Sequence, residues 1–422
     1  MDKPVDVIGI GAINYDYMFQ CSKHPDSIMP IDRATDSSSE ELNWTLERVE
    51  EDIHLLNGSN YTICSTQIGG SALLAMRAVH IVNPELSIGY VGVCGEYDNF
   101  DKLYTNYIKD IESELAFIDN KEWLFNTNDL PECPERYIGK ASCVIYKGSR
   151  NGIGIFPGAN NKIGDYIEKN NINDSFIEYL SQAKWIHVSS LSDINIWKYV
   201  MDFVLQAKKK NRFLKLSIDP GNEFTKCYKL ELQRYLQAAD YVFLSPSEKE
   251  NLSGRRIIED NDINTTLMEY FGNKPIVLVF KYKNRHVLLD CSRGTPYTYS
   301  HRVLPSVKLN NDTGAGDYFA GGFIGAILSD RLIAHQPAPI EIGNIVSKAR
   351  MCVNDIHEAN DIAQRDLECY FEKKYKNGAI NRIQKARLFF DRTENIIISL
   401  ILSLFTGIIS TLIVEFILGI IG

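Results

Sequence analysis

Three small residues, Gly314-Ala315-Gly316, are followed directly by an acidic residue, Asp317. Small residues let a backbone approach a ligand closely, and their consecutive N–H groups can converge on one anion. The following segment, YFAGGFIGAIL, predicts a helix whose positive N-terminal end favours a phosphate at this loop. Asp317 could accept the proton of a hydroxyl group that attacks this phosphate. The pattern indicates phosphoryl transfer, although an aspartate that only caps a helix fits the loop alone equally well.

A second set of polar residues follows the first predicted strand, VDVIGIGAI (5–13). Asn14 and Asp16 come directly after it, at the carboxyl end where open α/β sheets bind their ligands. An amide and a carboxylate at this edge could hold the hydroxyl groups of a substrate. The alternative is a turn that these two side chains stabilise themselves.

Together these motifs resemble the ribokinase (PfkB) family of carbohydrate and nucleoside kinases. The carrier of the resemblance is Asp312-Thr313-Gly314-Ala315-Gly316-Asp317 with the glycine-rich helix after it. By this likeness Asp317 is the catalytic base, and the amides of Gly314, Ala315 and Gly316 form the anion hole. Thr313, Gly314 and Gly316 are then expected to contact the nucleotide. The family pattern begins Asp-Thr, whereas this chain has Asn311-Asp312 there.

Further likenesses occur in the family's order over about residues 5–360. Asn14 and Asp16 resemble the residues that bind substrate hydroxyls, and Gly69-Gly70 resembles the substrate-contacting pair at the start of a helix. PGAN at 157–160 resembles the element after the lid strands, which makes Asn160 a candidate substrate ligand, with a loop cap as the alternative. Glu250 matches the glutamate of an Asn-x-x-Glu element linked to magnesium, although an exposed glutamate at a helix start is the alternative.

Three positions depart from the family pattern. Leu74 replaces the asparagine that follows the glycine pair, which removes a polar contact with the substrate. Ser247 replaces the asparagine of the Asn-x-x-Glu element. KYKNRH (281–286) stands where the family has Thr-x-Gly-x-x-Gly beside the nucleotide, which indicates an altered nucleotide pocket.

The elements that position these residues alternate as strands and helices. Apolar strands are predicted within 87–95, 185–190, 213–219, 241–245 and 276–280, with helical segments between them. This order predicts an α/β fold with a doubly wound, mostly parallel sheet flanked by helices. A hairpin at 142–157 would form a small β lid, with GSRNG (148–152) as its turn and Asn151-Gly152 as the turn signal.

The expected domain organisation has three parts. Residues 1–360 form a ribokinase-like kinase domain, with an insertion or lid at 21–60 and a lid hairpin at 137–160. Residues 361–394 form a polar helical connector, and residues 395–422 form a transmembrane anchor. The net charge of −9 makes a nucleic-acid partner unexpected. The nine cysteines show no zinc spacing, which favours free thiols.

The anchor is predicted from IIISLILSLFTGIISTLIV (396–414), which carries no charge. As a helix, such a run spans the roughly 30 Å hydrocarbon core of a bilayer. Lys385, Arg387 and Arg392 precede it, so the positive-inside rule predicts a single-pass membrane protein with a cytoplasmic kinase domain. Glu415 either ends the span at the far interface or serves a function within it.

Two functions remain open at the level of sequence. The first is a kinase that uses ATP and Mg²⁺ to phosphorylate a hydroxymethyl group of a small-molecule sugar or nucleoside. The second is a sensor domain of a membrane-anchored effector, which binds a nucleoside or sugar with little or no turnover. Leu74, the KYKNRH segment and the anchor motivate the sensor. The resemblance also allows a homo-oligomer, because family members often dimerise through the lid.

Overall fold

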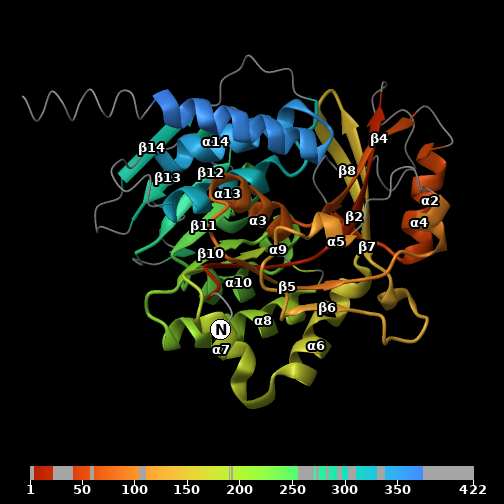
Figure 1. The fold of residues 1–422 in the computed structure, drawn as a ribbon, viewed down its shortest axis with the longest axis horizontal. Helices are drawn as coiled ribbons and strands as arrows, with labels where there is room; N and C mark the ends of the chain where they lie inside the picture. Colours follow the sequence, from red (N-terminus) through yellow and green to blue (C-terminus); the bar gives the residue numbers. More distant parts are fainter. Residues whose placement is uncertain are drawn as a thin grey trace, which may run out of the picture. The chain divides into compact units, whose positions relative to one another are not determined.

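The computed structural model describes the greater part of the chain in twelve stretches (Figure 1). These are residues 4–21, 41–57, 61–103, 111–189, 191, 193–254, 270–271, 275–281, 285–291, 297–302, 310–329 and 338–373. The chain divides into two compact units, Met1–Gln364 and Arg365–Gly422. All sheets and the site described below belong to the first unit, and residues 356–373 are helical.

A large sheet of nine described strands forms the centre of the first unit, in the order β14-β13-β12-β11-β10-β9-β1-β5-β6. Neighbouring strands from β12 to β6 run parallel, and β13 and β14 are antiparallel. This confirms the predicted mostly parallel α/β sheet. The strands are β1 (Val7–Ile10), β5 (Ile88–Cys94), β6 (Leu124–Asn126), β9 (Trp185–Ser189), β10 (Lys215–Asp219), β11 (Tyr241–Leu244), β12 (Val277–Lys281), β13 (Arg285–Asp290) and β14 (Tyr297–Arg302).

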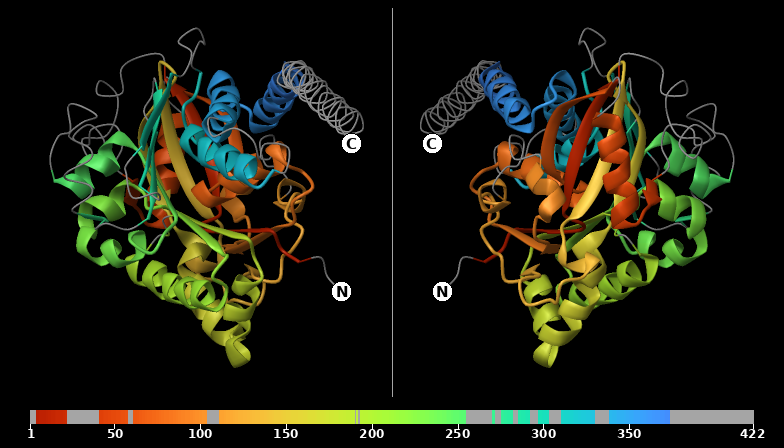
Figure 2. Two further views of the ribbon diagram at one scale, coloured as in Figure 1. Left: turned by 90° about the vertical axis from the view of Figure 1, so that its left-hand side faces the viewer. Right: turned by 90° about the vertical axis from the view of Figure 1, so that its right-hand side faces the viewer.

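Helices cover both faces of this sheet, as the green-yellow and the blue helices in Figure 2 show. Side chains of successive strand residues point to opposite faces, so Val7 and Ile8 of β1 belong to different apolar clusters. On one face lie α3 (Ser71–Val82), α13 (Ala315–Ile327) and α14 (Ala338–Cys352). On the other lie α6 (Ile163–Asn170), α7 (Ser175–Ser181), α8 (Ile194–Lys210), α9 (Asn222–Cys227), α10 (Lys229–Leu236) and α11 (Pro246–Ser253).

Strand order reverses between β1 and β9. After β1 the chain builds β5 and β6 on one side, and after β9 it builds β10, β11 and β12 on the other. In open α/β sheets the carboxyl ends of the strands at such a reversal leave a crevice for ligands. The residues that follow β1, β9 and β10 are therefore placed where a site can form.

A second sheet of five described strands, called the lid sheet here, has the order β3-β8-β7-β2-β4. One face packs against α2 (Leu46–Asn57) through side chains such as Tyr17, Val49 and Ile53 (Figure 1). Its other face carries Met18, Cys143 and Ile153. The strands are β2 (Asn14–Cys21), β3 (Glu41–Asn43), β4 (Tyr61–Gly69), β7 (Gly139–Tyr146) and β8 (Ser149–Phe156).

The lid sheet differs from the sequence prediction in two respects. The hairpin turns at Lys147-Gly148, whose φ angles of 50° and 77° suit a two-residue turn, and the predicted turn at Asn151-Gly152 is wrong. Asn151-Gly152 lies inside β8 instead. The strands β2 and β4 were not predicted, because each pairs with partners distant in sequence.

Short helical elements lie between the strands and the longer helices. They are α4 (Asn99–Leu103), α5 (Ile111–Glu114), η2 (Pro134–Arg136), η3 (Gly158–Lys162) and η4 (Ile172–Asp174). None of the helices in the described stretches is long and apolar enough to cross a membrane. The predicted anchor at 395–422, with Glu415, and residues 374–394 of the predicted connector lie outside the described residues.

Candidate active site

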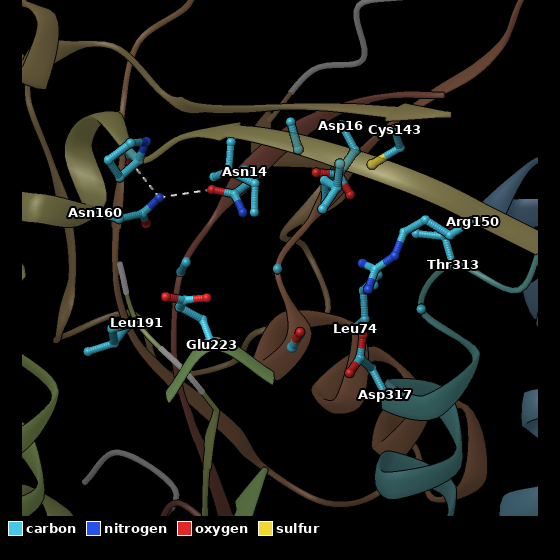
Figure 3. A pocket seen from close by; sticks show the side chains of 18 of the residues that line it. Asn14, Asp16, Leu74, Cys143, Arg150, Asn160, Leu191, Glu223, Thr313 and Asp317 are labelled. Atoms are coloured by element: carbon cyan, nitrogen blue, oxygen red, sulfur yellow. Dashed lines mark hydrogen bonds between the residues drawn. The ribbon is translucent and has the colours of Figure 1, made fainter. Parts of the chain in front are cut away.

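One cavity lies between the lid sheet and the carboxyl ends of the central strands (Figure 3). Residues predicted from two distant parts of the sequence meet there: Asn14 and Asp16 from the N-terminal part, and Thr313, Gly314 and Asp317 from the glycine loop. The remaining lining residues are Ala12, Gly70, Ser71, Leu74, Ala141, Cys143, Arg150, Ile153, Ile155, Pro157, Asn160, Leu191, Glu223 and Phe224.

The glycine loop leads into α13 through a residue in the left-handed conformation. Gly314 is the N-cap, with φ 77°, which a residue with a side chain rarely adopts. The Ala315 N–H donates to the Asp312 carbonyl at 3.2 Å and closes the turn. The N–H groups of Gly314 and Gly316 make no hydrogen bond with any described residue. Of the three predicted anion-hole residues, Gly314 lines the cavity, whereas Ala315 and Gly316 are not among its lining residues.

Asn311 and Asp312, which depart from the family pattern at the start of this loop, both make hydrogen bonds that hold it. The Asn311 side chain accepts the Thr313 N–H at 2.9 Å, which shapes the turn. Asp312 accepts the backbone N–H of Arg150 at 2.7 Å and so ties the lid hairpin to the loop. The hydroxyl of Thr313 is buried and has no hydrogen-bond partner among the described residues. A buried hydroxyl without a partner at a predicted nucleotide contact suits a ligand oxygen.

Asp317 and Arg150 approach the cavity from opposite sides. Asp317 stands on the first turn of α13 and points into the cavity in Figure 3. The Arg150 guanidinium comes from β8 of the lid sheet, also lines the cavity and lies above Asp317 in the view of Figure 3. The carboxylate can accept a proton from a bound molecule, and the guanidinium can bind a negatively charged group of that molecule.

A buried charged group, the Lys281 cluster, lies behind the glycine loop. It consists of Lys281 at the end of β12, Asp219 at the end of β10 and Glu248 of α11. The Lys281 ammonium is paired with Asp219, and a Cβ atom on Gly316 would lie 3.4 Å from its Nζ. Burial raises the pKa of Glu248 to about 7, and the charge of Asp219 acts in the same direction.

The electrostatics of this cluster keep Lys281 charged. Burial lowers the pKa of Lys281, but Asp219, Glu248 and Asp317 outweigh it and raise that pKa above its usual range. Glu248 is held by a capping box, in which its carboxylate accepts the Ser245 N–H at 2.6 Å. A positive charge is therefore fixed beside the loop at the physiological pH.

Asn160, which was predicted to bind substrate, instead holds Asn14 and the loop before it. Asn160 is 2% exposed, and its amide oxygen accepts the Ile13 N–H at 2.8 Å. Its amide nitrogen lies within hydrogen-bond distance of the oxygens of Ile13, Asn14 and Pro157. Asn160 thus lines the cavity, but both ends of its amide bind protein groups that fix the β1–β2 loop and Asn14.

The glycine pair lets two segments meet closely. A Cβ atom on Gly70, which has φ 115°, would lie 2.0 Å from the Ala12 carbonyl oxygen. A Cβ atom on Gly69 would lie 2.0 Å from a carboxylate oxygen of Asp16. Gly70 lines the cavity, whereas Gly69 supports Asp16. No larger residue fits either position without displacing the acceptor side of the cavity.

Comparison with protein families decides the identity of this domain. The profile of the pfkB family carbohydrate kinases matches residues 125–335, which is half of the chain. The chain belongs to the pfkB family of carbohydrate kinases. The matched segment includes the lid hairpin, the Lys281 cluster and the whole glycine loop. No curated protein matches the sequence of this kinase.

Solved structures of kinases share the fold at low sequence identity. Adenosine kinase from Sinorhizobium meliloti superposes with a TM-score of 0.64 and 14% identity, over 86% of this chain and 100% of that one. Ribokinase from Giardia lamblia gives 0.62 and 14%, over 87% and 99%. A nucleoside kinase from Burkholderia thailandensis in complex with inosine gives 0.56 and 13%, over 87% and 98%. These likenesses establish the ribokinase-like fold.

Within this kinase Glu250, the predicted metal ligand, is half-buried on α11 and does not line the cavity. The buried glutamate beside the loop is Glu248. Among the described residues there is no group of three or more His, Cys, Asp or Glu side chains suited to a metal ion. The Mg²⁺ contact of Glu250 stays a prediction.

Several lining residues were missed from the sequence. Arg150 and Glu223 both enter the cavity of the kinase, and Leu191 and Phe224 add apolar surface. Glu223 follows β10 closely, so its place after an apolar strand was a usable signal. Arg150 offered none, because its strand was predicted as part of a turn.

Proposed function

We propose that this kinase transfers the γ-phosphate of ATP, with Mg²⁺, to a hydroxymethyl group of a nucleoside or sugar. The observation that carries the proposal is the convergence in one cavity of Asp317 and the glycine loop with Asn14 and Asp16. One pair of elements can hold a phosphate, and the other can hold hydroxyl groups. Adenosine kinase and ribokinase structures with the same fold support both acceptor classes.

The reaction places the acceptor hydroxyl between Asp317 and the γ-phosphorus. Asp317 accepts the hydroxyl proton while the new oxygen–phosphorus bond forms and the bond to the β-phosphate oxygen breaks. The free N–H groups of Gly314 and Gly316 donate to the oxygens of the migrating phosphoryl group. ADP and the phosphate ester leave, and Asp317 returns its proton to water.

Two cations would balance the charge of the phosphates. Arg150 can follow the phosphoryl group from the lid side of the cavity, and Lys281 supplies a fixed charge behind Gly316. Positive charge that is already in place needs no rearrangement in the transition state. This explains why the chain can lack the glycines of the family pattern at 281–286: a buried ammonium stands beside the loop instead.

Magnesium would arrive with the nucleotide. Its usual mode is to bridge phosphate oxygens while it keeps several water molecules. Of the two carboxylates in the Lys281 cluster, Asp219 is already paired with Lys281. We therefore assign the direct contacts of Mg²⁺ to phosphates and water, with Glu250 as a candidate for an outer contact.

Between the two acceptor classes, the walls of the cavity favour a nucleoside. Leu74, Ile153, Ile155, Leu191 and Phe224 form an apolar surface that a nucleobase can bury and a free sugar cannot. The substitution of the family asparagine by Leu74 adds to this surface. Asn14 and Asp16 would bind the ribose hydroxyls.

A tether to the membrane belongs to the same proposal. The uncharged run at 396–414 supports a single-pass anchor, and the preceding basic residues support a cytoplasmic kinase domain. Such a tether would confine phosphorylation to the membrane surface.

The test uses the purified full-length chain in detergent, with ATP, Mg²⁺ and a panel of nucleosides and sugars. We expect turnover with a nucleoside, and a loss of roughly a hundredfold to ten-thousandfold in Asp317→Asn with unchanged ATP binding. Binding of a nucleoside by the wild-type chain without ADP formation would overturn the kinase in favour of the sensor, for which Leu74 on the cavity wall is the motivating observation.

A further inference from the structure

Asp16 is held by a partner that does not itself face the cavity. Asp16 lies on β2 opposite Gln67 of β4. The Gln67 amide nitrogen donates to Asp16 Oδ2 at 3.3 Å. Gln67 is 1% exposed and Asp16 is 6% exposed, so bulk water does not compete for this contact. A Cβ atom built on Gly69 would lie 2.0 Å from this same Oδ2, so a glycine is needed here to make room for the carboxylate.

Gln67 is oriented in turn by a buried arginine. Arg350 of α14 is 0% exposed, and its Nη2 donates to Gln67 Oε1 at 3.2 Å. Because an arginine only donates, it fixes the oxygen of the Gln67 amide on its own side. The Gln67 amide nitrogen must then face Asp16. Reversal of the amide would set its N–H groups against the guanidinium.

Arg350 also reaches the glycine loop. Its Nη1 donates to the Val353 carbonyl at 3.0 Å, which anchors the guanidinium at the end of α14. Its Nε is buried without a partner among the described residues and lies 3.8 Å from a Cβ atom built on Gly314. One buried cation thus lies between the carboxylate of the acceptor side and the loop of the phosphate side.

Burial of a guanidinium is costly unless its charge is compensated. Burial lowers the pKa of Arg350, and the Tyr318 hydroxyl, Asp16 and Asp355 act in the opposite direction. A contact needed only for the fold would be satisfied by the Val353 carbonyl. The additional Gln67 contact, directed at a residue of the cavity, indicates a role in the site.

We propose that Arg350 and Gln67 are positioning residues that orient the Asp16 carboxylate toward the hydroxyl groups of the acceptor. The proposal rests on the proposed function, because it assigns Asp16 to the acceptor. Arg350 keeps this carboxylate in register with Gly314, so the acceptor and the phosphoryl group meet at a fixed separation. Neither residue touches the substrate.

The test replaces Gln67 by leucine, which keeps the approximate shape and removes both hydrogen bonds. We expect the Kd and the KM for the nucleoside to rise roughly tenfold or more, because a hydrogen bond to a charged group is lost. The KM for ATP should stay within about twofold. Gln233→Leu is the matched control, since Gln233 binds the Tyr270 carbonyl at 2.9 Å away from the cavity.

A second variant separates positioning from folding. Arg350→Lys keeps the charge but cannot hold Val353 and Gln67 in the same geometry. We expect the same selective loss of nucleoside affinity. A merely structural role would instead lower Tm and weaken the binding of the nucleoside and of ATP together. Unchanged nucleoside affinity in Gln67→Leu would overturn the positioning role of Gln67 and Arg350.

Direct binding to the full-length chain, measured by calorimetry with the nucleoside alone, distinguishes the two proposals. If the wild-type chain binds a nucleoside but forms no ADP, the kinase proposal fails. The positioning role of Gln67 and Arg350 is then still judged by the nucleoside affinities of the variants. If the wild-type chain binds no acceptor of the panel, both proposals are overturned.

Discussion

Single residues of the site differ in how many contacts they have within the protein. The N–H groups of Gly314 and Gly316 and the hydroxyl of Thr313 have no hydrogen-bond partner within the described part of the chain, whereas the Asn160 amide is fully used by protein groups. Polar groups that the protein leaves unpaired are the ones a ligand can bind without displacing a partner. The phosphate side of the cavity is therefore prepared for a ligand, and Asn160 is a support.

Lys281 permits a test of charge at this scale. Lys281→Met alone would leave Asp219 and Glu248 buried without their cation, so the double variant Lys281→Met with Asp219→Asn is the better probe. We expect the double variant to fold with a Tm near that of the wild type. Its kcat/KM for ATP should fall roughly tenfold to a hundredfold, because a fixed charge beside the loop is lost. Wild-type kinetics in the double variant would show that Lys281 is only a buried ion pair.

The sequence could predict the glycine loop because its chemistry is local. Gly314, Ala315, Gly316 and Asp317 are adjacent, and their residue types alone indicate an anion site at a helix start. Gln67 and Arg350 could not be predicted, since they are 283 positions apart and meet only through the fold. Lys281 appeared in the sequence only as a missing glycine pattern.

Among the elements, the lid hairpin is tied to the phosphate side by the Asp312 side chain. Asp312 accepts the Arg150 N–H, so the hairpin that carries the Arg150 guanidinium is fixed relative to the glycine loop. We expect Asp312→Ala to lower kcat roughly tenfold and to raise the KM for the acceptor several-fold. Asp312→Asn keeps the accepting oxygen and is the control, which should stay near the wild type. Equal activity of both variants would contradict this role of the tether.

A pH-dependent group, the Glu50 carboxyl, lies between α2 and the lid sheet. Lys140 of β7 is fully buried and pairs with Glu50 of α2 at 2.8 Å and with Asp98 at 2.5 Å. Burial raises the pKa of Glu50 from 4.5 to about 7. Folded protein thus holds more protons than unfolded protein between these pH values, so Glu50 makes stability fall as the pH rises through this window.

Glu50→Gln imitates the neutral form and removes this slope. We expect the difference in Tm, variant minus wild type, to be near zero at about pH 4.5 and to grow more positive up to about pH 8. Asp101, whose pKa burial raises to about 6, pairs with the same Lys140 and adds a fall in stability of the same sign in both proteins. The measurement is a series of thermal unfolding curves over this pH range. A difference that becomes more negative with pH would contradict the assigned direction.

Elements were predictable where their pattern was continuous. The buried strands β9, β11 and β12 are short apolar runs, and α3 begins directly after the glycine pair as expected. The lid strands were harder, because β2 and β4 mix aromatic and polar residues whose two faces meet α2 and the cavity. The Asn-Gly pair inside β8 shows that a strong turn signal yields to the pairing of two longer strands.

At the scale of the whole molecule, the order of elements specifies the kinase fold even where individual residues have changed. Structures at 14% identity superpose over most of the chain. In this chain the fold supplies a crevice where strand order reverses, and the N-terminus of α13 lies at the cavity. We expect acceptor choice to depend on the few side chains that line the cavity, among which Leu74 and Phe224 favour the proposed nucleoside.

A single experiment on the whole chain can test the proposed membrane tether. In the full-length chain, Leu404→Arg with Ile409→Arg places two charges inside the uncharged run. Each charge at the centre of a span costs about 2.5–3.5 kcal/mol on insertion scales, which is enough to cancel the apolar gain of the run. We expect the wild-type chain to sediment with membranes after alkaline extraction and the variant to stay in the supernatant. Leu404→Ile with Ile409→Leu is the matched control and should sediment. Both proteins in the supernatant would refute the anchor, and kinase activity that is equal in both fractions would show that the tether sets location and not catalysis.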